Sequence, residues 1–289
     1  MGSWRVTVID HHRRSGGRPQ GRPAGPLARR DGLEVHGRPG EISCVDATGL
    51  VRWRRPCAGR PNAAHVSSGR VLVTTDSFDH TAWGHPGPAL LLDLVDGTQV
   101  AALRGERAAA LGGGRFVLGL EGHGTFHTWA HDRDGTLVDT WRSFGHYVVG
   151  SGLRVVETDR RHPTASRVAR LLPGGLVERG PLLTDPQAPE PLVLDDGTLL
   201  VLDAGVLRAV GRDLDDTVLA ELHPLPADRR HRFTGALHRT ADRLDVTLVE
   251  RHPTRMGAYT THAWALALHR PDQAGSTGPS PQVSIPQRN

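Results

Sequence analysis

Residues 42–53 read Ile-Ser-Cys-Val-Asp-Ala-Thr-Gly-Leu-Val-Arg-Trp. Apolar residues alternate on both sides of an Asp-x-x-Gly turn. This pattern predicts two short strands joined in a tight hairpin, because glycine supplies the positive φ that such turns need. Similar hairpins are predicted around Asp96-Gly97, Asp134-Gly135 and Gly174-Gly175, and a weaker one at 213–216. The chain therefore repeats one unit several times.

Each hairpin is preceded by two more short apolar segments in the same order, so the unit has four strands. The first strands begin near residues 26, 63, 108, 146 and 190, which gives a period of about 40 residues. Helical periodicity is nearly absent. Four strands at this spacing are typical of a β-propeller blade, and we expect an all-β propeller.

The sixth repeat lacks its last strand. Strands are predicted at 233–240, 244–250 and 261–269, after which the pattern stops, while residues 4–9 resemble the fourth strand of the other units. We therefore predict a six-bladed β-propeller in residues 1–272, with the ring closed by the N-terminal strand, since this leaves no open sheet edge. Seven blades are the alternative. Residues 11–25 are predicted to be a surface connection and residues 273–289 a disordered tail.

The hairpin Val45-Asp46-Ala47-Thr48-Gly49 leading to Trp53 resembles the repeat of the quinoprotein-type (PQQ-like) propeller family. The resemblance is partial at Asp96-Gly97 and at Asp134-Gly135 with Trp141. It implies the fold. Separately, the strand positions of the tryptophans predict that they pack between blades, namely Trp53, Trp129, Trp141 and Trp264. The chain has no adjacent cysteine pair and no Asp/Glu/Asn set for a calcium-quinone centre, so we expect no quinone cofactor.

Composition excludes some partners. All 35 basic residues are arginine and the formal net charge is only +4. The basic clusters are short and have no interleaved aromatic residues, so we expect no nucleic-acid binding. No apolar run reaches the roughly 18 residues that span a bilayer, and the N-terminus has no secretory leader, so we expect a cytoplasmic protein without a membrane partner. Cys44 and Cys57 are expected to be free thiols.

Carboxylates and histidines recur where the second strand of a unit ends. Since these connections gather on one face of a propeller, we expect them to meet at the mouth of the central channel. Trp83 lies between two histidines there and is a candidate to cover the mouth or bind a flat ligand. The candidate ligand or metal residues are Asp76, His80, Trp83, Glu121, His123, Asp159, His162, Glu250 and His252.

Two functions follow from this pattern. The first is a scaffold that presents a rigid disc to a protein or a small ligand on the channel face, in which the strand-end carboxylates bond backbone amides. The second is a metal-assisted hydrolase or lyase, because imidazole and carboxylate together suit a divalent metal and histidine suits acid–base chemistry near neutral pH. The sequence has no motif that selects a substrate.

Overall fold

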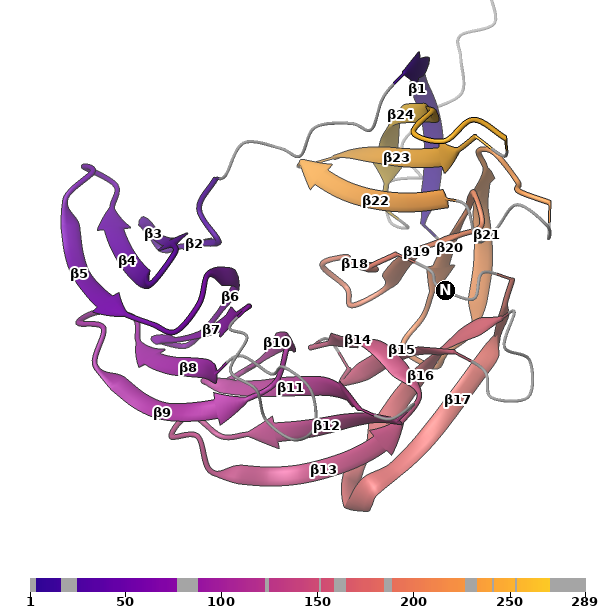
Figure 1. The fold of residues 1–289 in the computed structure, drawn as a ribbon. Coiled ribbons are helices and arrows are strands. Elements are labelled where there is room, and N and C mark those ends of the chain that lie inside the picture. The colour runs from indigo at the N-terminus through magenta and orange to yellow at the C-terminus, as the bar shows by residue number, and fades with distance from the viewer. Residues whose placement is uncertain are drawn as a thin grey trace, which may run out of the picture.

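The computed structural model describes residues 4–16, 25–76, 88–122, 125–150, 152–158, 165–184, 189–226, 233–240, 242–252 and 254–270. These residues form six four-stranded antiparallel sheets, an arrangement that fits a β-propeller. Figure 1 shows the sheets along an open arc, with the first and the sixth sheet at its two ends. No helix among the described residues is long and apolar enough to cross a membrane.

The first five sheets each consist of four consecutive strands. The first contains β2 (Ala28–Arg30), β3 (Leu33–Arg38), β4 (Glu41–Asp46) and β5 (Val51–Pro56), and the second β6 (Pro61–Ser67), β7 (Arg70–Thr75), β8 (Pro88–Asp93) and β9 (Gln99–Arg104). The third contains β10 (Arg107–Gly112), β11 (Arg115–Gly122), β12 (Thr125–His131) and β13 (Leu137–Ser143). The fourth contains β14 (Gly145–Val149), β15 (Arg154–Thr158), β16 (Ser166–Leu172), the short 3₁₀ turn η1 (Pro173–Gly175) and β17 (Leu176–Leu183). The fifth contains β18 (Leu192–Val193), β19 (Leu199–Asp203), β20 (Val206–Val210) and β21 (Asp216–Glu221).

The sixth sheet joins the two ends of the chain. It has the order β1-β24-β23-β22, with β1 (Arg5–Gly16), β24 (Tyr259–His269), β23 (Arg243–Arg251) and β22 (Phe233–Thr240). The predicted N-terminal strand therefore takes the fourth place in the last sheet. It is longer than predicted: β1 continues through Gly16, opposite Tyr259. Assigning residues 11–16 to a surface connection was wrong, because they form backbone pairs with the long strand β24.

Among the described residues, five apolar clusters hold the sheets together, each between neighbouring sheets. Trp53 belongs to the cluster between the first and second sheets, Trp141 to that between the third and fourth, and Trp264 to that between the fifth and sixth. The half-buried Trp129 packs on the cluster of the second and third sheets. These four tryptophans pack between sheets, as predicted. The indole N–H of Trp53 donates to the Leu94 carbonyl of the next sheet at 2.9 Å. This hydrogen bond orients the indole ring between the two sheets.

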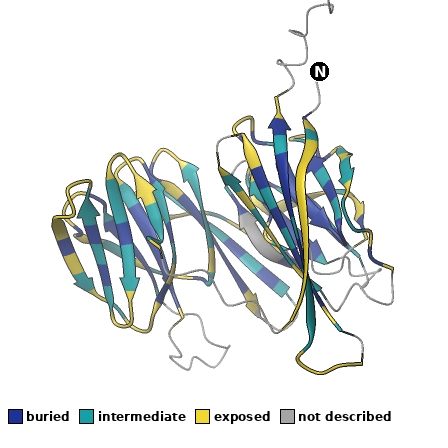
Figure 2. Ribbon diagram, turned by 90° about the horizontal axis from the view of Figure 1, so that it is seen from above, coloured by how far each residue is buried: buried dark blue, intermediate teal, exposed yellow. Residues whose placement is uncertain are grey.

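Burial within the second strand of each sheet shows how many neighbours the sheet has. In β7 and β19 nearly all residues are buried, because a sheet covers each face. In β23 buried residues alternate with half-buried ones, so only one face is covered by another sheet. Buried segments lie along the middle of the strands in Figure 2. Among the described residues, no apolar cluster joins the first sheet to the sixth, and ring closure at this point stays a prediction.

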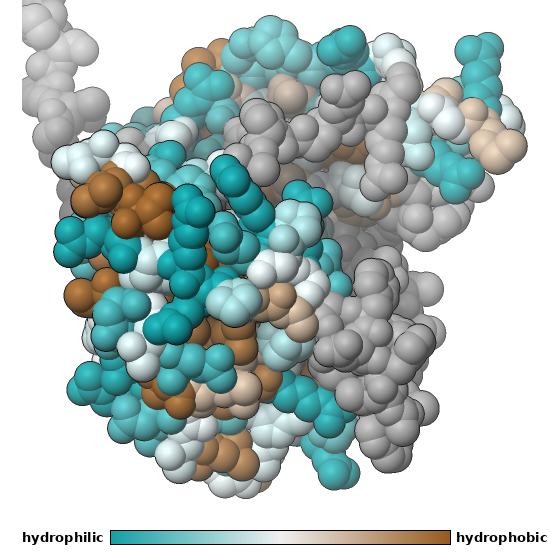
Figure 3. All heavy atoms as spheres, turned by 60° about the vertical axis from the view of Figure 1, so that its left-hand side comes forward, coloured by the Kyte–Doolittle hydropathy of each residue, from teal (hydrophilic) through white to brown (hydrophobic). Residues whose placement is uncertain are grey.

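The outer surface of the first sheets is mixed in polarity. Figure 3 shows hydrophilic side chains interspersed with small apolar areas on the side that carries these sheets. Arg52 and Arg54 are exposed on β5, while the Arg55 Nε donates to the Gly97 carbonyl at 2.7 Å. Cys44 is buried, Cys57 is half-buried, and both are free thiols, as predicted.

His65 makes the stability of the fold depend on pH. Burial of this β6 side chain lowers its pKa from 6.5 to about 4. The unfolded chain therefore takes up a proton below pH 6.5 that the folded chain refuses until about pH 4. The contribution of neutral His65 to stability is therefore fully present above pH 6.5. The free energy of unfolding falls by up to about 3 kcal/mol as the pH drops from 6.5 to about 4. In denaturant titrations from pH 7 to 4, His65→Gln is expected to lose less stability than the unchanged chain. An equal loss would contradict this, and His269→Gln, on an exposed side chain, is the control.

Candidate functional site

The structure describes four of the nine predicted site residues. Asp76, Glu121, Glu250 and His252 lie in the described part of the chain, whereas the other five lie outside it: His80, Trp83, His123, Asp159 and His162. The predicted gathering of all nine at one mouth therefore stays a prediction. The four described residues have different surroundings.

Asp76 forms a hydrogen bond with a backbone amide. Its carboxylate accepts a 2.7 Å hydrogen bond from the backbone N–H of Arg60, just before the first strand of the same sheet. Asp203, at the end of β19, accepts the N–H of Thr184 in the same way at 2.8 Å. The strand-end carboxylates of these two sheets thus bond backbone amides, which is the role expected for a scaffold.

Glu121 is exposed at the end of β11. Its backbone N–H lies 3.4 Å from a carboxylate oxygen of Glu106. No group of potential metal ligands among the described residues includes Glu121 or Asp76. These two residues therefore do not contribute to the cluster formed by Glu250.

Glu250 lies in a cluster with two histidines that the sequence pattern did not select. His223 follows β21, Glu250 lies near the end of β23, and His262 lies in β24. One potential ligand atom from each lies within 4.8 Å of the others. His223 Nε2 is 3.9 Å from Glu250 Oε2. We call His223, Glu250 and His262 the triad.

A glycine turn places His223 against the sixth sheet. Ala204 and Gly205, between β19 and β20, both have positive φ (49° and 87°), as a type I′ hairpin turn requires. The Gly205 carbonyl accepts the N–H groups of Leu222 and His223, at 3.1 and 3.0 Å. A Cβ on Gly205 would lie 1.9 Å from the His223 carbonyl oxygen. Only glycine therefore lets the segment after β21 lie so close to this turn.

The triad histidines belong to a set of nearly parallel rings. The rings of His223 and His262 have centroids 4.3 Å apart and planes inclined by 24°. His11 lies 4.7 Å from Trp264 at 7° and 5.8 Å from His262 at 5°. His262 and Trp264 are two residues apart on β24 and share a face, so the strand itself aligns their rings. The β1 strand brings His11 to the same face, opposite Trp264.

The electrostatics of the triad favour neutral His262. Burial lowers the pKa of His262 to about 4, and the positive charges of His223, Arg13 and His11 act in the same direction, while Glu250 opposes them. The side chain of His262 is only 5% exposed. Its Nδ1 is buried and has no hydrogen-bond partner among the described residues. A buried nitrogen of this kind is costly to leave unpaired, and a neutral imidazole nitrogen is also a metal ligand.

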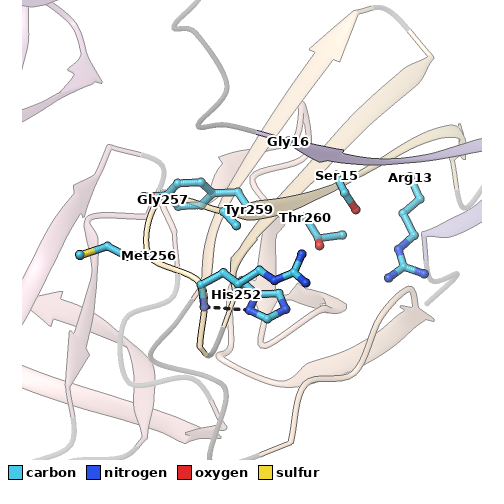
Figure 4. A pocket seen from close by; sticks show the side chains of 10 residues that line it. Arg13, Ser15, Gly16, His252, Met256, Gly257, Tyr259 and Thr260 are labelled. Carbon is cyan, nitrogen blue, oxygen red and sulfur yellow. Dashed lines mark hydrogen bonds between the residues drawn. The ribbon is translucent and has the colours of Figure 1, made fainter.

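A pocket of about 730 Å³ lies at the end of the sixth sheet. Its walls come from the end of β1, from the connection between β23 and β24, and from the start of β24, as Figure 4 shows. Arg13 is opposite His262 in the β1–β24 register, and Thr260 is opposite both Ser15 and Glu250. Paired residues share a face of an antiparallel sheet, so the pocket continues the face that carries the triad.

His252 lines this pocket and lies outside the triad. Its Nδ1 accepts the backbone N–H of Arg255 at 3.0 Å, drawn as a dashed line in Figure 4, and that of Thr254 at 3.3 Å. The backbone N–H of His252 donates to the Ala258 carbonyl at 2.9 Å. The ring therefore orders the connection between β23 and β24, and no hydrogen bond to its Nε2 is found among the described residues.

The sequence offered a signal for only part of this site. A strand was predicted at 261–269, and alternation within it places His262 and Trp264 on one face. His223 has no such signal, because it lies outside a strand and reaches the triad only through the packing of the fifth sheet on the sixth. His11 was missed because the N-terminal strand was predicted to end before it.

No protein-family model and no curated protein matches this chain. Solved structures similar to it include Hsv2 of Kluyveromyces lactis (TM-score 0.47, 9% identity, 75% of this chain and 69% of that one). TolB from Acinetobacter baumannii has a TM-score of 0.39 and 11% identity over 77% of this chain and 59% of its own. Uncomplexed Pyrococcus horikoshii acylaminoacyl peptidase has a TM-score of 0.46 and 11% identity over 76% of this chain and 42% of its own. This chain thus spans less than two thirds of the last two structures.

Proposed function

We propose that this chain is a six-bladed β-propeller, closed by its N-terminal strand, that serves as a rigid binding scaffold. Its ligand site lies at the end of the sixth sheet, where the triad binds one divalent transition-metal ion. The observation that carries the proposal is the convergence of His223, Glu250 and His262 from three separate segments, with ligand atoms within 4.8 Å of one another.

The donor set indicates the class of metal. Two imidazoles and one carboxylate suit Zn²⁺ and similar ions, which bind nitrogen and oxygen at about 2.0–2.2 Å. Ligand atoms around such an ion lie about 3.4 Å apart in a tetrahedral site, so metal binding requires the triad to contract by roughly 1 Å. His223 can supply this movement because it is half-buried and lies outside a strand.

Zinc titration of the full chain tests this function. After treatment with a chelator and its removal, isothermal titration calorimetry is expected to show one Zn²⁺ bound per chain. His262→Ala is expected to weaken binding by at least about tenfold, because it removes one of three ligands. Zinc should also raise the melting temperature of the unchanged chain, since a ligand that binds only the folded state stabilises it.

His269→Ala is the matched control, because His269 lies on the same strand as His262 but is exposed. This control is expected to bind zinc as the unchanged chain does. Equal zinc affinity of the unchanged chain and a folded His262→Ala variant would contradict the proposal, as would a complete absence of binding.

The second candidate function is a metal-assisted hydrolase or lyase. The triad supplies three ligands, which leaves a fourth position for water, and two histidines with one glutamate are a ligand set used by zinc hydrolases. The adjoining pocket could hold a substrate beside that position. Zinc-dependent cleavage of an activated ester that is lost in His262→Ala would favour this candidate over the scaffold alone.

A further inference from the structure

The pocket beside the triad has a cationic, donor-rich wall. Arg13, Arg255 and His252 line it, together with the hydroxyl groups of Ser15, Tyr259 and Thr260, and none of its lining residues is acidic. Neither Arg13 nor Arg255 forms an ion pair with a carboxylate among the described residues. Guanidinium groups without an acidic partner bind carboxylates and phosphates strongly, because each donates charge-assisted hydrogen bonds in a planar fork.

The bonding of His252 turns this ring into another donor. Its Nδ1 accepts backbone N–H groups from Thr254 and Arg255. A neutral imidazole that accepts at Nδ1 carries its proton on Nε2. The loop therefore holds an N–H donor ready at the pocket wall, and this donor suits an anion and not a cation.

The two sides of the pocket differ in chemistry. In Figure 4, Arg13, Ser15 and Thr260 lie on one side and Met256 on the other, with His252 between them. Met256 is 90% exposed, and the half-buried Tyr259 adds an aromatic ring to the wall. A thioether and an aromatic ring favour contact with an apolar group of a ligand. The pocket volume of about 730 Å³ is in the range of small-molecule sites.

We propose that this pocket binds a small organic anion, whose carboxylate or phosphate is held by Arg13, Arg255 and His252 while its apolar part contacts Met256 and Tyr259. The anion site has its own residues and does not need a metal. It rests on the proposed function in one respect only: Arg13 is opposite His262 in the register, so a bound anion would lie next to the triad and could become a ligand of its metal.

Binding of model anions to the metal-free full chain tests this inference. Benzoate and phenyl phosphate are the probes, and neutral benzamide has the same ring without the charge. In calorimetric titrations with chelator present and at low salt, we expect at least one of the two anions to bind at least about tenfold more tightly than benzamide. The comparison of benzoate with phenyl phosphate distinguishes a carboxylate from a phosphate ligand.

Two variants attribute the binding to the pocket. Arg13→Gln and Arg255→Gln are each expected to weaken anion binding by about tenfold, since each removes a charge-assisted contact. Arg5→Gln is the matched control, because Arg5 is exposed on the same strand as Arg13 and outside the pocket. Circular dichroism confirms the fold of each variant.

Binding of neither anion, or equal anion affinity of Arg5→Gln and both pocket variants, would overturn the inference. These outcomes are independent of the zinc titration. Loss of zinc binding in His262→Ala with unchanged anion binding in the metal-free protein would support both sites. Anion binding without any zinc binding would leave the anion site standing and remove the metal proposal.

Discussion

Deletion of residues 1–10 is expected to abolish the cooperative unfolding transition of this protein. The deletion removes the indole of Trp4, which is 6% exposed and packs between the fifth and sixth sheets. It also removes the hydrogen bond from Trp4 Nε1 to Asp196 Oδ2 at 2.7 Å, and half of the strand that pairs with β24. The part of β24 that pairs with this half, residues 265–269, would then be a strand edge without a partner, which favours aggregation.

A single substitution measures the largest part of this effect. Trp4→Ala is expected to lower the free energy of unfolding by about 3–5 kcal/mol, as the loss of a large buried aromatic side chain does. Urea titrations monitored by circular dichroism give the value. Arg5→Ala is the control on the neighbouring exposed residue and is expected to change stability by less than about 0.5 kcal/mol.

The deletion also tests the closure of the propeller by its N-terminal strand. If the shortened chain unfolds cooperatively with unchanged stability, then β1 is dispensable and this closure is wrong. Loss of the transition in the deletion variant, together with a large loss in Trp4→Ala, would support it.

Gly205→Ala is expected to lower stability by about 3 kcal/mol or more and to weaken zinc binding. An alanine Cβ would lie 1.9 Å from the His223 carbonyl oxygen, a backbone atom that cannot move without displacing the triad. The positive φ of 87° adds a cost of about 1–2 kcal/mol for any residue with a Cβ. Thermal unfolding and zinc titration of the variant measure the two effects.

Gly69→Ala separates the steric effect from the backbone strain. Gly69 has a φ of 77° and follows Ser68, which also has positive φ, in the same position of an equivalent turn. A Cβ there would meet nothing within 4 Å. This control should lose only about 1–2 kcal/mol and bind zinc normally. Equal losses in the two variants would show that contact with the His223 segment is not what requires glycine at 205.

Part of the candidate site could be predicted from the sequence. Glu250 and His252 follow a strong alternating strand, so their position near one end of a sheet was predictable from local pattern. Asp76 was selected by the same reasoning, yet its carboxylate bonds the Arg60 N–H. A strand-end carboxylate suits an amide as well as a metal, and the local sequence does not distinguish the two.

The sequence by itself determined the repeat, because alternation and glycine turns act over a few residues. The hairpins and the four-strand unit follow from such local rules. The place of the N-terminal strand in the last sheet follows from the count of strands, because the sixth repeat lacks a fourth strand and residues 4–9 resemble one. The length of β1 does not, since residues 11–16 are polar and form a strand only because β24 offers them backbone partners.

Only the tertiary structure decided which side chains meet. His223 lies 27 positions before Glu250 and 39 before His262 in the chain, and it reaches both because the fifth sheet packs on the sixth and Gly205 allows the close approach. The burial that lowers the pKa of His262 likewise arises from that packing. Contacts between sheets depend on the shape and volume of many side chains together, and no short stretch of sequence contains that information.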